Sequence, residues 1–157
     1  MISLDRRPRL VAHFLNPALI AVIVAACAAE YERTKGERMP WILLFVATPL
    51  VLHGPSRRAL PRDTRTHLST WVARNPTIVA AFPERARGLI PSVGEGLRYG
   101  VRCGVLSLAD QRVTTRFATR RVTGHLGEVV QAAGLVGRWL AKLDRPSTAY
   151  ALLGVTP

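Results

Sequence analysis

The sequence is poor in the residues that metal sites, disulfide frameworks and most active sites need. Its two cysteines, Cys27 and Cys103, sit on predicted helices in apolar settings, so we expect buried free thiols, as in a reducing compartment. The four histidines are scattered, and no pair has the spacing that binds a metal on one helix face. No glycine-rich phosphate loop with the required Lys and Ser/Thr is present. Cys103 and His125 lack a third orienting group, which makes a nucleophile and base pair the weaker interpretation. We therefore predict a protein that is not an enzyme and holds no metal or cofactor.

Long hydrophobic runs are also missing. The two apolar segments, residues 18–29 and residues 41–52, are both shorter than the roughly 20 residues that cross a bilayer as a helix. We predict no membrane span but a helical hairpin over residues 10–60, with its surplus apolar surface covered by the rest of the chain or by another protein. The first segment faintly imitates a secretory signal. Because it begins with the helix cap Asn16-Pro17 and ends in charged residues, we predict a cytoplasmic location instead.

Negative charge is scarce in this chain. It has 22 Lys and Arg against 10 Asp and Glu, a net charge of +12, and its only lysines are Lys35 and Lys142. Residues 61–121 hold eleven of the arginines and four of the acids. Such an excess suits nucleic acid or another polyanion. A proteome biased toward arginine codons produces the same composition, so both interpretations stay open.

What the sequence does contain, over residues 61–121, is the pattern of a winged-helix-like unit. Three helical segments are predicted to follow one another, over residues 64–74, 76–89 and 91–103. Pro83 should kink or divide the second segment, because it deletes a helical hydrogen bond. The third starts with a capping box, in which Ser92 and Glu95 satisfy each other's backbone donors. Residues 105–115 then read as a β-hairpin, with β-branched residues beside a polar turn, and would form the wing.

The C-terminal part, residues 122–157, is predicted to be helical. A long amphipathic helix spans about residues 124–143, and a short helix follows over residues 147–153. Three glycines interrupt the long helix, Gly127, Gly134 and Gly137. Each costs about 1 kcal/mol relative to alanine in a helix, which predicts close approach of a second helix there. The whole chain is thus predicted to be one domain of the mainly α class, with a single β-hairpin.

Short motifs along most of the chain resemble those of a known family. They are Asn16-Pro17, Pro49-Leu50-Val51-Leu52-His53, Leu60-Pro61-Arg62, Trp71 with Asn75-Pro76, Glu84-Arg85-Ala86-Arg87, Gly137-Arg138-Trp139 and Leu152-Leu153-Gly154-Val155-Thr156-Pro157. In these positions the chain is similar to the middle-component family of bacterial three-component ABC systems. It departs from the family pattern at Gly96 and Gly100, where bulky residues are usual, and we expect a flatter surface there.

This resemblance implies a small non-catalytic protein, encoded in one operon with an SMC- or Rad50-like ABC ATPase and a variable effector. Such a protein would couple the two in defence against phages or plasmids. The partners that the resemblance implies are the ATPase and the effector. A DNA contact that is not sequence-specific is a separate prediction, which rests on the arginines of the winged-helix-like unit.

Three hypotheses about function remain open at this point. The first, which we favour, is a coupling subunit whose partner interface includes Trp41, Trp71, Arg138 and Trp139. It would be an obligate partner, aggregating or self-associating when expressed alone, because the apolar segments exceed what a small helical domain readily hides.

The second hypothesis is a winged-helix DNA-binding protein that acts through a basic surface. Its contacts would be Arg98, Tyr99, Arg102, Arg112 and Arg116, backed by Arg120 and Arg121. They would be directed to the DNA backbone, because the third predicted helix has no Asn or Gln for base readout. The third hypothesis is a small membrane-associated protein that uses the two apolar segments.

Overall fold

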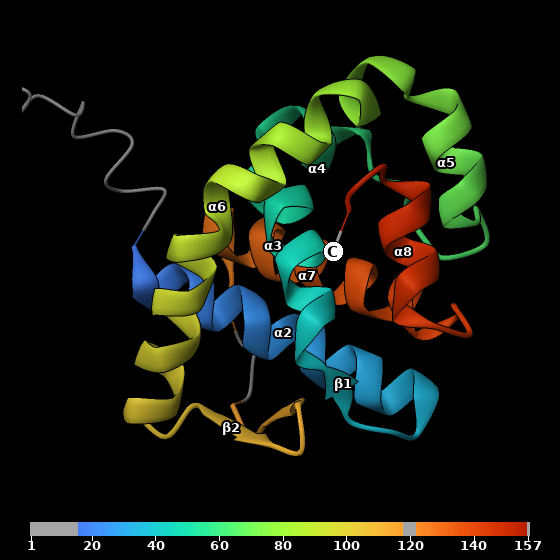
Figure 1. The fold of residues 1–157 in the computed structure, drawn as a ribbon. Helices are drawn as coiled ribbons and strands as arrows, with labels where there is room; N and C mark the ends of the chain where they lie inside the picture. Colours follow the sequence, from blue (N-terminus) through green and yellow to red (C-terminus); the bar gives the residue numbers. More distant parts are fainter. Residues whose placement is uncertain (1–15, 118–121, 157) are drawn as a thin grey trace, which may run out of the picture.

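The computed structural model of the protein describes residues 16–117 and 122–156. It is mainly helical with one small sheet, which confirms the predicted fold class (Figure 1). In chain order the elements are α2 (Pro17–Lys35), β1 (Met39–Pro40), η1 (Trp41–Leu43), α3 (Leu44–Leu52), α4 (Gly54–Ala59), α5 (Leu68–Arg74), α6 (Pro76–Arg102), β2 (Leu106–Ala109), β3 (Arg112–Thr115), α7 (Gly124–Ala141) and α8 (Pro146–Leu152).

The two apolar segments form the centre of the protein. Helix α2 begins at Pro17, where the side chain of Asn16 accepts a hydrogen bond from the Ala18 N–H, as its cap motif predicted. Helices α6 and α7 pack against α2, and α3 packs against both of them, so nine of the 19 residues of α2 and seven of the nine residues of α3 are buried. Most of the surplus apolar surface is therefore covered within this chain, although Trp41 and Ile42 stay exposed. That outcome removes the reason for expecting the protein to aggregate alone.

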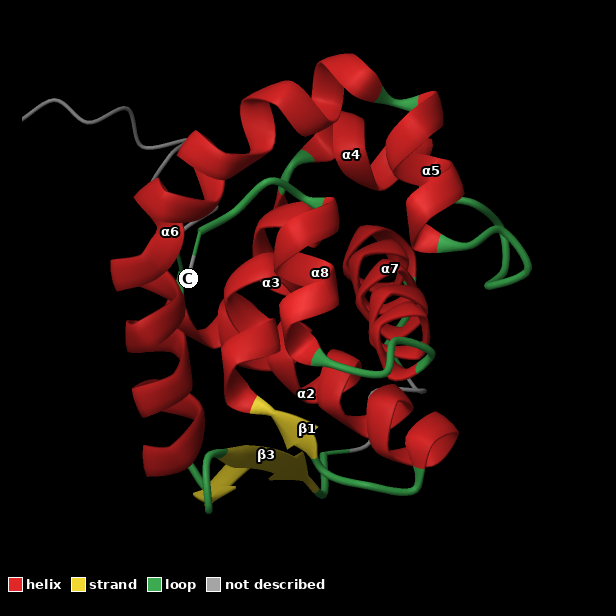
Figure 2. Ribbon diagram, turned by 45° about the vertical axis from the view of Figure 1, so that its right-hand side comes forward, coloured by secondary structure: helices red, strands yellow, loops and turns green. Residues whose placement is uncertain are grey.

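Helix α6 is one continuous helix of 27 residues with Pro83 and Pro91 inside it. It arches over the top of the molecule and then runs down one side (Figure 2). The predicted break at Pro91 is wrong and Ser92 is no cap, so the segment predicted to form a winged-helix-like unit has two helices, α5 and α6, instead of three. Burial explains the continuity, because Phe82, Val93 and other apolar residues of α6 on both sides of Pro91 are buried in the common core.

The predicted hairpin is confirmed, and it gains one strand. Asp110 and Gln111 both have positive φ and form the tight turn between β2 and β3. The third strand, β1, pairs with β3 through Met39 opposite Val113, giving the antiparallel order β1-β3-β2. The prediction of a single hairpin is therefore wrong. It missed β1 because a strand of two residues is too short to show the alternation of apolar and polar residues.

The segment between α3 and α5 contains the short helix α4, which was not predicted from the sequence. The Nδ1 atom of His53 accepts a hydrogen bond from the Ser56 N–H at 3.2 Å and so caps the start of α4. The guanidinium of Arg57 donates 2.7 Å to the carbonyl of Val51 in the last turn of α3. Histidine is not one of the usual N-cap residues, so no capping signal in the sequence predicted this helix.

Close approach of a second helix was predicted for three glycines of α7, and Gly137 confirms it, whereas a Cβ on Gly127 would meet the backbone of Val122, just before α7 itself. A Cβ on Gly137 would sit 3.0 Å from the carbonyl carbon of Cys27 in α2, and closer still to the carbonyl oxygen. A Cβ on Gly134 would lie 3.2 Å from Cγ of Glu30. The backbones of α2 and α7 therefore come too close at Gly137 for a larger side chain, whereas at Gly134 the neighbouring atoms belong to the side chain of Glu30. This contact fixes the position of α7, on which the candidate site is built.

Candidate functional site

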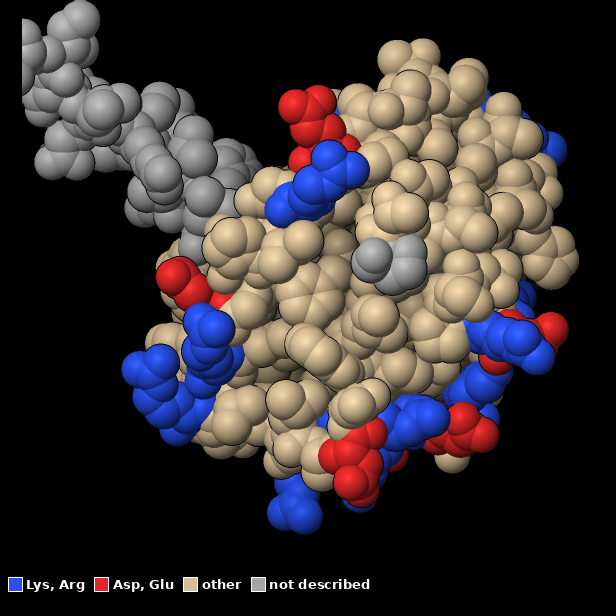
Figure 3. Space-filling model, viewed as in Figure 1, with Lys and Arg blue, Asp and Glu red and all other residues tan. Residues whose placement is uncertain are grey.

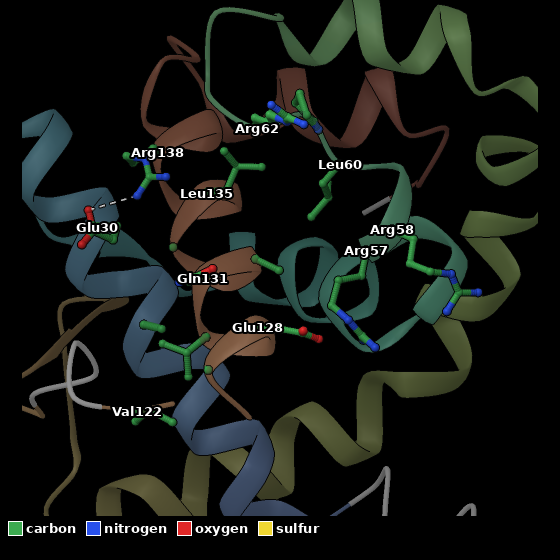
Figure 4. A pocket seen from close by; sticks show the side chains of 16 residues that line it. Glu30, Arg57, Arg58, Leu60, Arg62, Val122, Glu128, Gln131, Leu135 and Arg138 are labelled. Atoms are coloured by element: carbon green, nitrogen blue, oxygen red, sulfur yellow. Dashed lines mark hydrogen bonds and ion pairs between the residues drawn. The ribbon is translucent and has the colours of Figure 1, made fainter. Parts of the chain in front are cut away.

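A cleft of about 760 Å³ runs along the solvent side of α7, between α2 and the segment that contains α4 (Figure 4). Apolar side chains line its middle, where Leu135 of α7 and Leu60 after α4 lie between the charged residues. Its charged lining residues are Glu30, Arg57, Arg58, Arg62, Glu128 and Arg138. A concave surface of this size, apolar with polar groups around it, has the general character of a binding site.

Two tryptophans hold the α4 wall of the cleft in place. The Trp71 Nε1–H donates 2.9 Å to the carbonyl of Ala59 at the end of α4. The Trp139 Nε1–H of α7 donates 2.6 Å to the carbonyl of Thr66 in the following loop. The two indoles pack edge to face, with ring centroids 5.7 Å apart. The loop after α4 is thereby tied to α7, and Arg62 lies on this loop.

The predicted partner interface is not brought together. Trp71 and Trp139 are each only 2 % exposed, so they pack in the core and cannot meet a partner, and that part of the prediction is wrong. Trp41 is 38 % exposed on η1 and packs edge-on against Phe45, so it does lie at the surface. Arg138 lines the cleft. The large apolar area of the two indoles favours their burial. Because a buried N–H needs an acceptor, each indole donates its N–H to a backbone carbonyl.

One arginine of the cleft already has an acidic partner. The Arg138 Nη1 atom lies 3.5 Å from Oε2 of Glu30, and Glu30 also pairs with Arg33 on its own helix. Gly134 lies beneath this pair, because a Cβ there would approach both Glu30 and Arg138. The ion pair bridges α2 and α7 at one side of the cleft (Figure 4).

The arginines around α4, by contrast, lack acidic partners within the described residues. Arg57, Arg58, Arg62 and Arg85 have no carboxylate oxygen within the 4.0 Å of an ion pair there. The Nη1 atom of Arg85 is buried and makes no hydrogen bond in the described part of the chain. Partial burial, and then the positive charges of Arg85, Arg58 and Arg57, lower the pKa of His53 below its ordinary value. The potential at this end of the cleft is therefore positive.

The predicted nucleic-acid contacts lie on a second surface. Lys and Arg side chains gather over the C-terminal part of α6 (Figure 3), where Arg98, Tyr99 and Arg102 are exposed. Arg116 is exposed just after β3. Arg112 is partly occupied, because its Nη1 atom donates 2.6 Å to the Arg38 carbonyl and lies 3.9 Å from Glu37. We call the five residues Arg98, Tyr99, Arg102, Arg112 and Arg116 together the basic surface. Residues 120 and 121, expected to support it, lie outside the described residues.

The two glycines of α6 that depart from the family pattern face inward. A Cβ on Gly96 would lie 2.6 Å from Cβ of Ile20, and one on Gly100 would lie 2.7 Å from Cγ of Leu106. The expectation that they flatten an outer surface is wrong. They bring α6 close to α2 and β2, because no larger side chain fits between these elements.

The thiols differ from each other in a way that the sequence did not predict. Cys27 is buried as expected, and burial raises the pKa of its thiol to about 12. Cys103 is exposed, contrary to the prediction, because it lies at the C-terminal cap of α6, beyond the packed part of that helix. Within residues 16–117 and 122–156, no group of three or more His, Cys, Asp or Glu side chains is placed to hold a metal ion. Over the same residues, no helix combines the length and the apolar character of a membrane span.

Most of the cleft residues were missed by sequence reasoning. The predicted contacts included neither Arg57 and Arg58 of α4 nor Glu128 and Gln131 of α7, all of which line the cleft. A signal that could have found the arginines was their clustering in the sequence. Arg57, Arg58 and Arg62 follow one another closely, and the one acid beside them is Asp63.

The comparison with family models gives one match. The model described as ABC-three component (ABC-3C) system Middle Component 3 matches residues 4–157. No curated protein and no solved structure matches the chain. Since the match covers nearly the whole sequence, the chain belongs to the Middle Component 3 family of ABC-three component systems.

Proposed function

We propose that this middle component is a non-catalytic coupling subunit, which links an SMC- or Rad50-like ABC ATPase to an effector in a cytoplasmic bacterial defence system. The observation that carries the proposal is the presence of two separate surfaces. The cleft is built on α2, α4 and α7, whereas the basic surface is built on the end of α6 and on β3. They share no residue, so two partners can be bound at once.

The rigidity of the core supports the same role. Helix α2 contacts both α6, which carries part of the basic surface, and α7, which forms the base of the cleft. Close contacts hold these helices against α2, at Gly96 with the side chain of Ile20 and at Gly137 with the backbone of Cys27. A tightly packed core transmits a displacement from one surface to the other more readily than a loose one does.

Reconstitution of the three purified components tests the proposal. We expect a ternary complex in which the ATPase and the effector associate only when the middle component is present. Variants of the cleft and variants of the basic surface should each lose one partner and keep the other. Direct association of ATPase and effector without this chain, or binding of the chain to neither, would refute the proposal. Phage and plasmid challenge of cells that carry the three genes tests the defence role.

A second candidate function, binding of DNA without sequence specificity, is favoured by Arg98 and Arg102. They lie one turn apart on α6, both are exposed, and neither pairs with a carboxylate of the described residues. Affinity for duplex DNA should fall roughly tenfold or more between about 50 and about 200 mM salt. Replacing both arginines by alanine should reduce the slope of log K against log salt by about 2. The matched control is Arg74→Ala with Arg145→Ala, two exposed arginines on other elements. Salt-insensitive or sequence-selective binding would exclude this function.

A further inference from the structure

The arginines around α4 form an unusual feature of this molecule. Arg57, Arg58, Arg62 and Arg85 have no carboxylate within ion-pairing distance among the described residues, although three of them line the cleft. The acid of the cleft on the far side, Glu30, is already engaged by Arg33 and Arg138. The other acid, Glu128, has only His125 as its partner, at 3.5 Å. Positive charge on the α4 side is therefore left for a ligand to neutralise.

The geometry of the cleft indicates the shape of that ligand. Figure 4 shows Arg62 near one end of the cleft and Arg57 near the other, with Leu60 and Leu135 between them. These guanidinium groups do not converge on one point, as they would around a single phosphate group. Their separation along an apolar base suits an extended segment with acidic side chains at intervals and apolar side chains between them.

The charge of the chain argues against a second copy as occupant. Each copy carries a net charge of +12, so a symmetric contact through this wall would bring like charges together. An acidic polypeptide, in contrast, would pair with guanidinium groups, which bind carboxylates with two parallel hydrogen bonds.

We propose that the cleft over α7 binds an acidic segment of one of the other two components of the system. In this arrangement the carboxylates of the segment pair with Arg62 and Arg57, and its apolar side chains contact Leu60 and Leu135. This inference rests on the proposed coupling function, because it assumes that a partner component binds this chain.

Gln131 gives the sharpest test, because it is exposed on α7 and lines the cleft, and its side chain makes no hydrogen bond to the described residues. Gln131→Glu and Gln131→Lys place opposite charges in the cleft with little change of volume. A third variant, Arg62→Glu, reverses a charge of the wall. The controls are the same two substitutions at Gln111, in the exposed hairpin turn, and Arg145→Glu. Affinity of each full-length variant for the purified ATPase component and for the purified effector component is measured at low and at moderate salt.

We expect one of the two components to bind Gln131→Glu more weakly and Gln131→Lys more tightly than the wild type, each by up to about fivefold, which is the range of an exposed ion pair. Arg62→Glu should weaken the same component by roughly tenfold, because it removes one attraction and adds one repulsion. All effects should shrink as salt rises. The control variants should bind like the wild type.

Three results would overturn the inference. If a component binds the wild type and all cleft variants with equal affinity, the cleft is not its binding site, although the coupling function still stands. A change in DNA affinity alone would assign the arginines to nucleic acid. Failure of the wild type to bind either component would refute the coupling function together with this inference.

Discussion

Replacing Gly137 by alanine tests whether the contact between α2 and α7 is as close as the structure indicates. The three atoms nearest to the new Cβ would all be backbone atoms of Cys27, with the carbonyl oxygen closest, the carbonyl carbon at 3.0 Å and the Cα at 3.2 Å. Backbone atoms cannot rotate away as a side chain can. One of the two helices must therefore move by several tenths of an ångström or more, and the packing around α2 must move with it.

The expected magnitude follows from two opposing terms. Overpacking of a dense core costs typically about 1–3 kcal/mol and occasionally more. Alanine gains up to about 1 kcal/mol over glycine in a helix interior. Because the contact is with backbone, we expect the upper part of the overpacking range, and a net loss of about 2 kcal/mol. For a chain of this length that loss lowers the melting temperature by roughly 4–8 °C.

The matched control is Gly94→Ala in α6, where an added Cβ would meet nothing within 4 Å. This variant should gain stability, by up to about 1 kcal/mol, from helix propensity alone. Urea unfolding followed by the fluorescence of the buried tryptophans Trp71 and Trp139 measures both variants by linear extrapolation. If Gly137→Ala is as stable as Gly94→Ala, the close approach of α2 and α7 is wrong.

Three further outcomes are expected. Trp139→Phe should lower the free energy of unfolding by about 1–3 kcal/mol in denaturant titrations, because it removes the N–H that satisfies the carbonyl of Thr66; an unchanged midpoint would contradict that hydrogen bond. A thiol reagent should modify Cys103 in the folded protein and Cys27 only after unfolding, since burial raises the pKa of Cys27 to about 12, and mass spectrometry identifies the modified residue. His53 has a lowered pKa when folded, so the unfolded state binds its proton first and stability falls as pH drops through the ordinary value of 6.5. His53→Asn keeps a capping side chain and should lose less stability than the wild type between about pH 7.5 and about pH 5.5. An equal loss of stability in both proteins would contradict the lowered pKa of His53.

The mainly helical class, the positions of most helices and the hairpin could be predicted because they depend on local signals. Asn16-Pro17 caps α2, Pro76 starts α6, and a polar turn precedes the β-branched residues of β3. Gly137 also indicated a contact outside its own helix. A helix that contains this glycine despite its unfavourable propensity has a neighbour, α2, whose backbone leaves no room for a side chain.

The tertiary structure alone decided the course of α6 and the nature of the cleft. Pro91 is a strong local signal for a helix end, yet α6 continues through it, because burying Phe82, Val93 and Leu97 along one side offsets the cost of about 3 kcal/mol for a proline inside a helix. The cleft joins residues of α2, of the α4 segment and of α7, which are far apart in the chain. Local sequence patterns specify elements of structure, whereas the wall that Trp71 and Trp139 hold in place exists only once those elements are packed together.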